Sequence, residues 1–290
     1  MRLRLPRIDR LFPPFRCCGI PALAWLLLLG SCQDHPATDP DQPATGNTVR
    51  PFTLIGFTTT GLYPHDTTAF TEGLLFHEGE LYESTGHVDE VPASRSWFGL
   101  VNLRTGRIDP KVQLPRDKYF GEGICFLHGK VYQLTYKDRV GFVYDAKTFK
   151  KLGEFSPPGR EGWGMTTDGQ SLLISDGTST LYYMDPSTFQ TVRTLKVTEN
   201  DVPPDSLNEL EYIKGYIYAN RYTKDYIFKI DPANGKVLGR LDCSSLAGAT
   251  KNKYPGSMEL NGIAYDPVSD RIFITGKCWP DIYTIRLPNP

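Results

Sequence analysis

Five positions in this chain carry side chains that suit ligand binding or proton transfer, and each opens a copy of one repeated phrase. The phrase is an apolar strand, a short turn and a second strand. Its copies begin at Glu72, Glu122, Trp163, Asn208 and Asn261. Successive copies lie 50, 41, 45 and 53 residues apart. Because repeated units place equivalent residues at equivalent positions, we expect two carboxylates, two amides and one indole to form a ring.

The spacing of the copies also predicts the architecture. A period of roughly 40 to 50 residues with several short strands per repeat is typical of a β-propeller. The second repeat shows four strand patterns in succession, at residues 123–128, 131–136, 140–144 and 151–155. Each repeat is therefore expected to fold as one blade of four antiparallel strands.

Five repeats predict an all-β, five-bladed propeller, and no sixth repeat is visible. The fifth repeat holds only three strand patterns, at residues 262–265, 271–276 and 281–286, before the chain ends. We expect its missing outer strand to come from the start of the domain, near residues 52–57. An N-terminal strand in the last blade would close the ring and remove an exposed sheet edge.

Four aromatic residues and a lysine should share one mouth of the central channel with the ring. Tyr136 and Tyr222 each stand 14 residues after a ring residue, where the second strand returns to the same end of its blade. Lys277 stands at the corresponding end of the fifth blade. Phe70 and Phe120 precede the two ring glutamates by two positions, and residues i and i+2 of a strand share a face. Each ring glutamate is thus expected beside a phenyl ring.

This combination of side chains predicts acid–base chemistry on an amine and a carboxamide. A carboxylate against aromatic surface loses hydration, which raises its pKa and lets it exchange a proton near neutral pH. A second carboxylate can hold a cationic amine, while amides and a lysine can orient and polarise a carbonyl. Aromatic walls exclude water from such a site.

Six short motifs resemble those of glutaminyl-peptide cyclotransferases of the plant and bacterial type, a family of five-bladed propellers. They are FTEGL (70–74), YFGEGI (119–124), EGWGMTTDG (161–169), LNELEY (207–212), LNGIAYD (260–266) and ITGKCWP (274–280). They span all five repeats in order. The resemblance implies an enzyme that converts the N-terminal Gln of peptides or proteins to pyroglutamate and releases ammonia, without a metal for catalysis.

The resemblance also implies roles for individual residues. Glu122 matches the general acid/base, and Glu72 stands next to the substrate α-amine. Trp163 matches a pocket wall, Asn208 an amide that orients the substrate, and Lys277 a polar group near the substrate carbonyl. Any of these last three would stabilise the oxyanion formed when the amine attacks the γ-carbonyl.

The other expected substrate-binding residues are Phe70, Phe120, Asn261 and the two mouth tyrosines. Tyr136 and Tyr222 stand where plant members typically have Trp, which keeps an aromatic wall but alters the shape of the pocket. No sign of an oligomer appears, so a monomer is expected.

Two other functions stay open from the sequence. A propeller with this mouth can bind a peptide or a sugar without catalysis, since unrelated functions share one fold. A calcium-dependent hydrolase of the lactonase kind would hold its ion in the channel on Glu and Asn ligands. A structural calcium is compatible with the cyclotransferase as well. The sequence shows no CxxC, HExxH or clustered His that would cage a catalytic transition metal.

The N-terminal 31 residues predict a targeting segment. Five arginines precede a short apolar run at residues 17–30, which is typical of a secretory signal peptide. The run ends in Leu29-Gly30-Ser31-Cys32, which resembles a bacterial lipobox and predicts lipidation of Cys32. A plain cleaved signal with an incidental Cys is the alternative. We therefore expect an exported, periplasmic or outer-membrane-anchored lipoprotein.

Composition divides the remaining chain into a tether and one domain. Residues 32–50 are rich in Pro, Asp and Thr and should be disordered, and residues 51–290 should form the propeller. Without residues 1–31 the chain has 27 basic and 32 acidic residues, a formal charge of about −5, and no basic patch. Nucleic acid is therefore not an expected partner. Cys125, Cys243 and Cys278 allow at most one disulfide among them.

Overall fold

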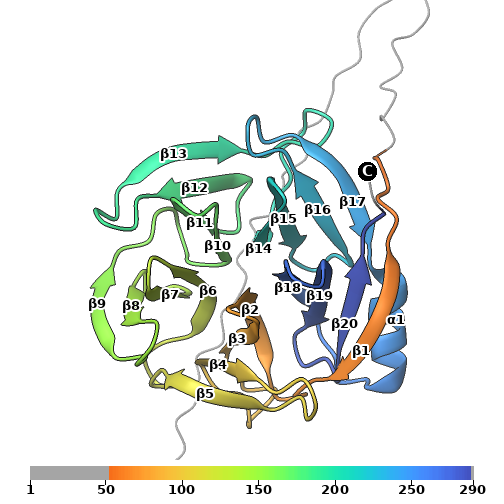
Figure 1. Cartoon of the computed structure of the whole chain (residues 1–290), viewed down its shortest axis with the longest axis horizontal. Coiled ribbons are helices and arrows are strands. Elements are labelled where there is room, and N and C mark those ends of the chain that lie inside the picture. Colours follow the sequence, from red (N-terminus) through yellow and green to blue (C-terminus); the bar gives the residue numbers. More distant parts are fainter. Residues whose placement is uncertain (1–51, 289–290) are drawn as a thin grey trace, which may run out of the picture. The chain divides into compact units, whose positions relative to one another are not determined.

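Five four-stranded antiparallel sheets surround a central axis in the computed structural model, which describes residues 52–288 (Figure 1). In four of the sheets the strands run outward in chain order, from an innermost first strand to a fourth strand at the rim. In the last sheet the rim strand comes from the start of the domain. The predicted five-bladed β-propeller is confirmed. The predicted signal peptide, Cys32 and all of the predicted tether lie outside the described residues.

The blades follow one another along the chain. Blade 1 contains β2 (Phe70–His77), β3 (Glu80–Gly86), β4 (Trp97–Val101) and β5 (Ile108–Gln113). Blade 2 contains β6 (Gly121–Leu127), β7 (Lys130–Thr135), β8 (Gly141–Asp145) and β9 (Lys151–Phe155). Blade 3 contains β10 (Met165–Thr167), β11 (Leu172–Ser175), β12 (Thr180–Met184) and β13 (Thr191–Lys196). Blade 4 contains β14 (Leu207–Ile213), β15 (Tyr216–Arg221), β16 (Tyr226–Ile230) and β17 (Val237–Asp242).

Blade 5 is closed by a strand from the start of the domain, as expected, but not by residues 52–57. It contains β18 (Leu260–Asp266), β19 (Arg271–Gly276), β20 (Asp281–Arg286) and, as its outer strand, β1 (Thr58–Pro64). The sequence of β1 is poor in apolar residues because the strand is largely exposed, so hydrophobic patterning did not reveal it. The closing strand was predicted near residues 52–57 because these residues, just before β1, are more apolar.

Residues 53–55 form a strap on the neighbouring blade. Ile55 donates its backbone N–H to the Arg240 carbonyl, and Arg240 donates its own to the Thr53 carbonyl, both at 2.8 Å. This pairing is parallel to β17. The first described segment therefore binds blade 4 before it becomes the outer strand of blade 5.

The hydrophobic core is divided among the five blade interfaces. Each of five clusters of buried side chains contains residues from two adjacent blades. The inner strands are the most buried, and every residue of β6 is buried. Burial of apolar surface at these interfaces is what holds neighbouring blades together, since few backbone hydrogen bonds cross between them.

Glycines allow the inner strands to approach closely. A Cβ on Gly123 would lie 2.5 Å from the backbone nitrogen of Met165, and one on Gly164 would lie 2.1 Å from the Asn208 carbonyl oxygen. Both distances are shorter than van der Waals contact. The small residue that follows most ring residues is thus required by packing around the axis.

Blade 4 has a glutamate where the other repeats have this glycine. The Glu209 carboxylate accepts hydrogen bonds from the backbone nitrogens of Leu74 and Ile263, at 3.2 and 2.9 Å. Farther along the same strand, Glu211 accepts a hydrogen bond from the backbone nitrogen of Tyr265 at 3.0 Å. These two carboxylates, of which Glu209 is buried and Glu211 half-buried, join blade 4 to blades 1 and 5 across the axis.

The single helix among the described residues, α1 (Ser244–Lys253), lies at the rim beside β1 and β20 (Figure 1). No described helix has the length and apolar character needed to cross a membrane. Cys125, Cys243 and Cys278 are all buried and free. The disulfide that the sequence allowed among them is therefore not formed.

Candidate active site

Irregularities in the inner strands aim the ring residues toward one end of the axis. The strand register shifts at Glu72 in β2, Glu122 in β6, Asn208 in β14 and Asn261 in β18. Such β-bulges re-aim individual side chains and are common beside active sites. Trp163 differs from the other four, because it precedes β10 instead of lying within a strand.

A pocket of about 200 Å³ opens at this end of the axis. It is lined by Phe70, Glu72, Val88, Phe120, Glu122, Tyr136, Trp163, Asn208, Tyr222 and Lys277. The structure thus brings nine of the expected site residues together around one pocket. Asn261 is the expected residue that does not line the pocket.

Five aromatic rings form a collar around the pocket. Ring centroids are 6.0 Å apart for Phe70 and Phe120, 5.9 Å for Phe120 and Tyr136, 6.3 Å for Tyr136 and Trp163, and 5.8 Å for Trp163 and Tyr222. Lys277 completes the circle, because its Nζ lies 5.3 Å from the Tyr222 ring and 4.3 Å from the Phe70 ring. Edge-to-face pairs of this kind hold one another in place.

An ion pair lies inside the collar. Lys277 Nζ is 2.6 Å from Glu72 Oε1, and both side chains are almost completely buried. Asn261 lies behind this pair: its Nδ2 donates to Glu72 Oε2 at 3.1 Å and to the Thr71 carbonyl at 2.9 Å. Asn261 therefore fixes the Glu72 carboxylate and does not face the pocket.

Burial dominates the electrostatics of the two glutamates. It raises the pKa of Glu72 to about 7, against the lowering effect of the Lys277 ammonium. It also raises the pKa of Glu122 well above its usual range, and the adjacent Glu72 carboxylate adds to that rise. Burial acts to lower the pKa of Lys277, but the two carboxylates outweigh it and leave that pKa raised.

Glu122 differs from Glu72 in having no partner. No group within residues 52–288 donates a hydrogen bond to its carboxyl, which is buried at the pocket floor with 5 % of the residue exposed. A buried carboxyl with a raised pKa and a free face toward a pocket is suited to accept and release a proton near neutral pH.

The indole N–H of Trp163 is already engaged. It donates to Glu161 Oε2 at 3.0 Å. Burial raises the pKa of the nearby Tyr136 hydroxyl, and the Glu161 carboxylate adds to that rise. Trp163 is therefore a wall of the pocket but does not offer a free donor to an oxyanion. Asn208 has a free acceptor, because its buried Oδ1 lacks any partner in the described part of the chain, and this oxygen is suited to an N–H group of a ligand.

Comparisons with known proteins identify the family. A family model described as glutamine cyclotransferase matches residues 30–287. The chain belongs to this family. A glutaminyl-peptide cyclotransferase of Arabidopsis thaliana is 40% identical to it over 227 residues, which is 78% of this chain and 69% of that protein. The crystal structure of Myxococcus xanthus glutaminyl cyclase covers 82% of this chain and 98% of its own, with a TM-score of 0.72 and 34% identity.

Two residues of this glutamine cyclotransferase site were missed by sequence analysis. Val88 follows β3 and lines the pocket, but an isolated valine in a loop carries no signal. Glu161 stood within a recognised motif, two positions before Trp163. Its spacing from the indole was the available signal, since residues i and i+2 of an extended segment point the same way.

The site offers little to a metal ion. No group of three or more His, Cys, Asp or Glu side chains within the described residues is arranged to hold one. The two glutamates at the pocket floor face Lys277, whose ammonium occupies the place that a cation would take beside Glu72. A lactonase-like calcium that used Glu72 as a ligand would have to displace this ammonium.

Proposed function

We propose that this chain converts the N-terminal Gln of peptides and proteins to pyroglutamate and releases ammonia, with Glu122 as general acid/base. Family membership supports the reaction, and the unpaired, buried Glu122 carboxyl at the floor of the pocket is the observation that carries its role. The substrates are peptide N-termini, and no cofactor takes part.

The size of the pocket suits one residue. Its volume of about 200 Å³ lies below the roughly 300–1,000 Å³ of pockets that enclose drug-sized ligands. An N-terminal Gln would enter alone, and the rest of the peptide would stay outside the aromatic collar. Confinement folds the flexible side chain back on its own amine, which replaces an entropically costly search by a fixed geometry.

The charges of the pocket suit an amine. With both glutamates ionised, Glu72, Glu122 and Lys277 sum to one negative charge, which attracts the substrate α-ammonium. Free α-amines have pKa values near 7.7–8.0, so a substantial neutral fraction exists for attack near neutral pH. Glu72 is held by Lys277 and Asn261 and offers a fixed carboxylate beside the amine.

Proton transfer would then follow in one cycle. The neutral amine nitrogen attacks the γ-carbonyl carbon of the same Gln, and the new C–N bond closes a five-membered ring. The Glu122 carboxylate takes the proton that this nitrogen loses and gives it to the carboxamide nitrogen. The old C–N bond breaks, and ammonia leaves. Glu122 ends the cycle unprotonated, as it began.

The oxyanion that forms between these two steps needs donors. Lys277 and Asn208 line the pocket and supply an ammonium and an amide. Trp163, also expected in this role, has its N–H directed to Glu161. Donors fixed in a water-poor pocket stabilise developing charge without reorganising.

The test is ammonia release from a short peptide with N-terminal Gln, catalysed by the full chain and measured both without and with a chelator. The proposal predicts release, and a product lighter by one ammonia in mass spectrometry. A peptide whose α-amine is acetylated is the matched control and should release none. If no release exceeds the spontaneous background while the protein is folded, the site is that of a binding propeller. Release that stops with the chelator would indicate a metal-dependent reaction.

We also propose that residues 1–31 are a lipoprotein-type signal peptide and that Cys32 carries the acyl anchor. Residues 32–50 would then tether the domain, residues 51–290, to that anchor. The predicted product is an exported periplasmic or outer-membrane lipoprotein. Metabolic labelling with a radioactive fatty acid tests this in a bacterial host. The native chain should be labelled and the Cys32→Ser variant should not; equal labelling of both would contradict the proposal.

A further inference from the structure

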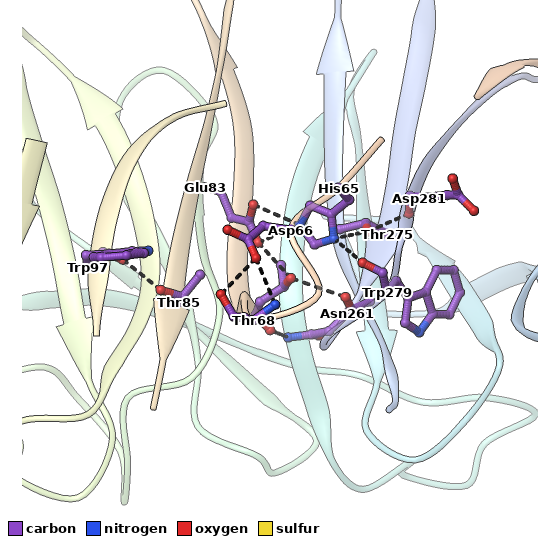
Figure 2. Close-up of polar contacts among 12 residues, drawn as sticks. His65, Asp66, Thr68, Glu83, Thr85, Trp97, Asn261, Thr275, Trp279 and Asp281 are labelled. Carbon is purple, nitrogen blue, oxygen red and sulfur yellow. Dashed lines mark hydrogen bonds and ion pairs between the residues drawn. The ribbon is translucent and has the colours of Figure 1, made fainter. Parts of the chain in front are cut away.

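A buried histidine–glutamate pair lies directly behind the catalytic pocket. Figure 2 shows His65 between the Glu83 carboxylate and the Trp279 carbonyl. His65 Nε2 is 3.1 and 3.0 Å from the two Glu83 oxygens, and its Nδ1 is 2.7 Å from the Trp279 oxygen. Both side chains are completely shielded from solvent. Neither residue lines the pocket.

The hydrogen-bond partners fix the orientation of the imidazole. The Trp279 carbonyl can only accept, so His65 Nδ1 carries a proton. Nε2 then faces both Glu83 oxygens, and one proton lies between the ring and the carboxyl group. Burial acts to lower the pKa of His65, but Glu83, the Trp279 carbonyl and, more weakly, Asp66 outweigh it and leave that pKa raised. The pair is therefore a compact buried hydrogen-bonded unit.

One arm of hydrogen bonds connects the pair to Glu72. Thr71 Oγ1 donates to Glu83 Oε1 at 2.7 Å, and the Thr71 carbonyl accepts from Asn261 Nδ2 at 2.9 Å. The same Asn261 nitrogen donates to Glu72 Oε2 at 3.1 Å. Thr71 and Glu72 are adjacent in the chain, so Glu83 sets the backbone of the bulge that carries Glu72.

A second arm connects the pair to Lys277. The Trp279 carbonyl that accepts from His65 belongs to the turn after β19, two residues beyond Lys277. That turn is tied to blade 1 as well, because Cys278 donates its backbone N–H to the Ala69 carbonyl at 2.8 Å. Both partners of the pocket ion pair are thus held from behind by one buried pair.

His65 also follows the strand that closes the ring. It is the first residue after β1, and its backbone N–H donates to the Pro280 carbonyl at 2.9 Å. The His65 imidazole therefore links the end of the closing strand to two other parts of the fold. It contacts blade 1 through Glu83 and blade 5 through the Trp279 carbonyl.

We propose that His65 and Glu83 are positioning residues, which set the places of Glu72 and Lys277 and so couple closure of the propeller ring to an assembled active site. The inference rests on the proposed function for its kinetic readout. It differs from a purely structural role, in which loss of the pair lowers the amount of folded protein and leaves each folded molecule fully active.

The kinetic test compares Glu83→Ala, Glu83→Gln and Glu211→Ala in the full chain, per folded molecule. Glu83→Ala removes the acceptor of both His65 and Thr71, and it should lower kcat/KM by about 10- to 100-fold, because displacement of a positioning group by about 1 Å costs that much. Glu83→Gln keeps an acceptor and should restore most of the activity. Glu211→Ala is the control, since it removes a half-buried carboxylate that also accepts a backbone hydrogen bond but does not line the pocket, and its kcat/KM should stay native.

A double-mutant cycle separates this inference from the proposed function. The free energies of unfolding of Glu83→Ala, Glu72→Gln and the double variant need no enzymatic activity. Coupled changes support the positioning role even if the native chain releases no ammonia, in which case only the proposed function fails. Additive changes, or a kcat/KM for Glu83→Ala equal to that of Glu211→Ala, overturn the positioning role.

Discussion

Three ionisable side chains within one small pocket determine what this site can do. Glu72 and Lys277 form a buried pair, and Glu122 faces the same pocket without a partner. The difference in partners separates their roles, although the two acids are the same residue type. Glu72 is held in place by Lys277 and Asn261, whereas the Glu122 carboxyl stays free to exchange a proton, and burial raises the pKa of both. Pairs of acids in unlike environments commonly divide catalytic labour this way.

Replacing Glu72 should move the pH dependence of turnover. The Glu72 carboxylate raises the pKa of Glu122, and Lys277 lowers it. Glu72→Gln removes the first effect and frees Lys277 to exert the second, so the pKa of Glu122 should fall. Because the ionised Glu122 accepts the proton, the acidic limb of the kcat profile should move to lower pH. A limb that stays in place or moves to higher pH would show that Glu122 does not set it.

Glu161 should govern binding more than chemistry. Its carboxylate accepts the hydrogen bond of the Trp163 indole, and that indole packs edge-to-face against the Tyr136 ring in the collar. Glu161→Ala should loosen this wall and raise KM several-fold with a smaller effect on kcat. Glu161→Gln keeps an acceptor for the indole and should retain most of the binding. An unchanged KM in Glu161→Ala would argue against a role in the wall.

At the scale of elements, the bulges and the strap explain how a repeated strand pattern becomes one asymmetric site. The bulges turn ring residues inward at four inner strands. The strap then joins blade 4 to blade 5 before β1 closes the ring. Each closing element adds contacts that only a complete ring provides.

The strap should contribute to stability without contributing to catalysis. Ile55→Pro removes the N–H that bonds the Arg240 carbonyl and should lower the free energy of unfolding by about 1–3 kcal/mol. Leu54→Ala is the matched control, because the Leu54 side chain is mostly exposed and its loss should be nearly neutral. Chemical denaturation measures both. Equal stability of the two variants would show that the strap pairing contributes nothing.

Across the whole molecule, buried acids accumulate along the axis. Burial raises the pKa of Glu211 to about 8 and that of Glu209 well above its usual range, in addition to the two pocket glutamates. A folded-state pKa above the unfolded value gives stability that is present at low pH and lost as pH rises through the folded value. The free energy of unfolding should therefore fall between about pH 5 and pH 8.

Glu211→Gln tests this pH dependence, because an amide of the same shape cannot ionise. The variant should lose less stability than the native chain between these pH values, as measured by denaturation at several pH values. A native chain whose stability rises across this range would contradict the assignment of raised pKa values to the axial acids.

Repetition explains why so much of the pocket was predictable from sequence. Equivalent positions in five repeats fix Glu72, Glu122 and Asn208 at one mouth, because strand order alone determines which end of a blade they occupy. The second-strand positions Tyr136 and Tyr222 follow by the same reasoning. Once the period was recognised, the fold and these placements needed no tertiary information.

What sequence analysis missed depends on contacts between distant parts of the chain. Asn261 was expected in the pocket but is turned behind Glu72, and the Trp163 N–H is taken by Glu161. The pairing of His65 with Trp279 spans 214 residues and breaks the repeat, since no other blade has an equivalent. The closing strand was misplaced because its exposed sequence lacks an apolar pattern.

The central claim is that Glu122 transfers the proton during cyclisation, and Glu122→Gln tests it most directly. Ammonia release from an N-terminal Gln peptide should be measured for the native chain and this variant at equal concentrations of folded protein. General acid–base catalysis is worth about 10²- to 10⁴-fold, so the variant should lose activity by that factor while its fold and stability persist. Turnover by Glu122→Gln within a few-fold of the native rate would contradict the claim.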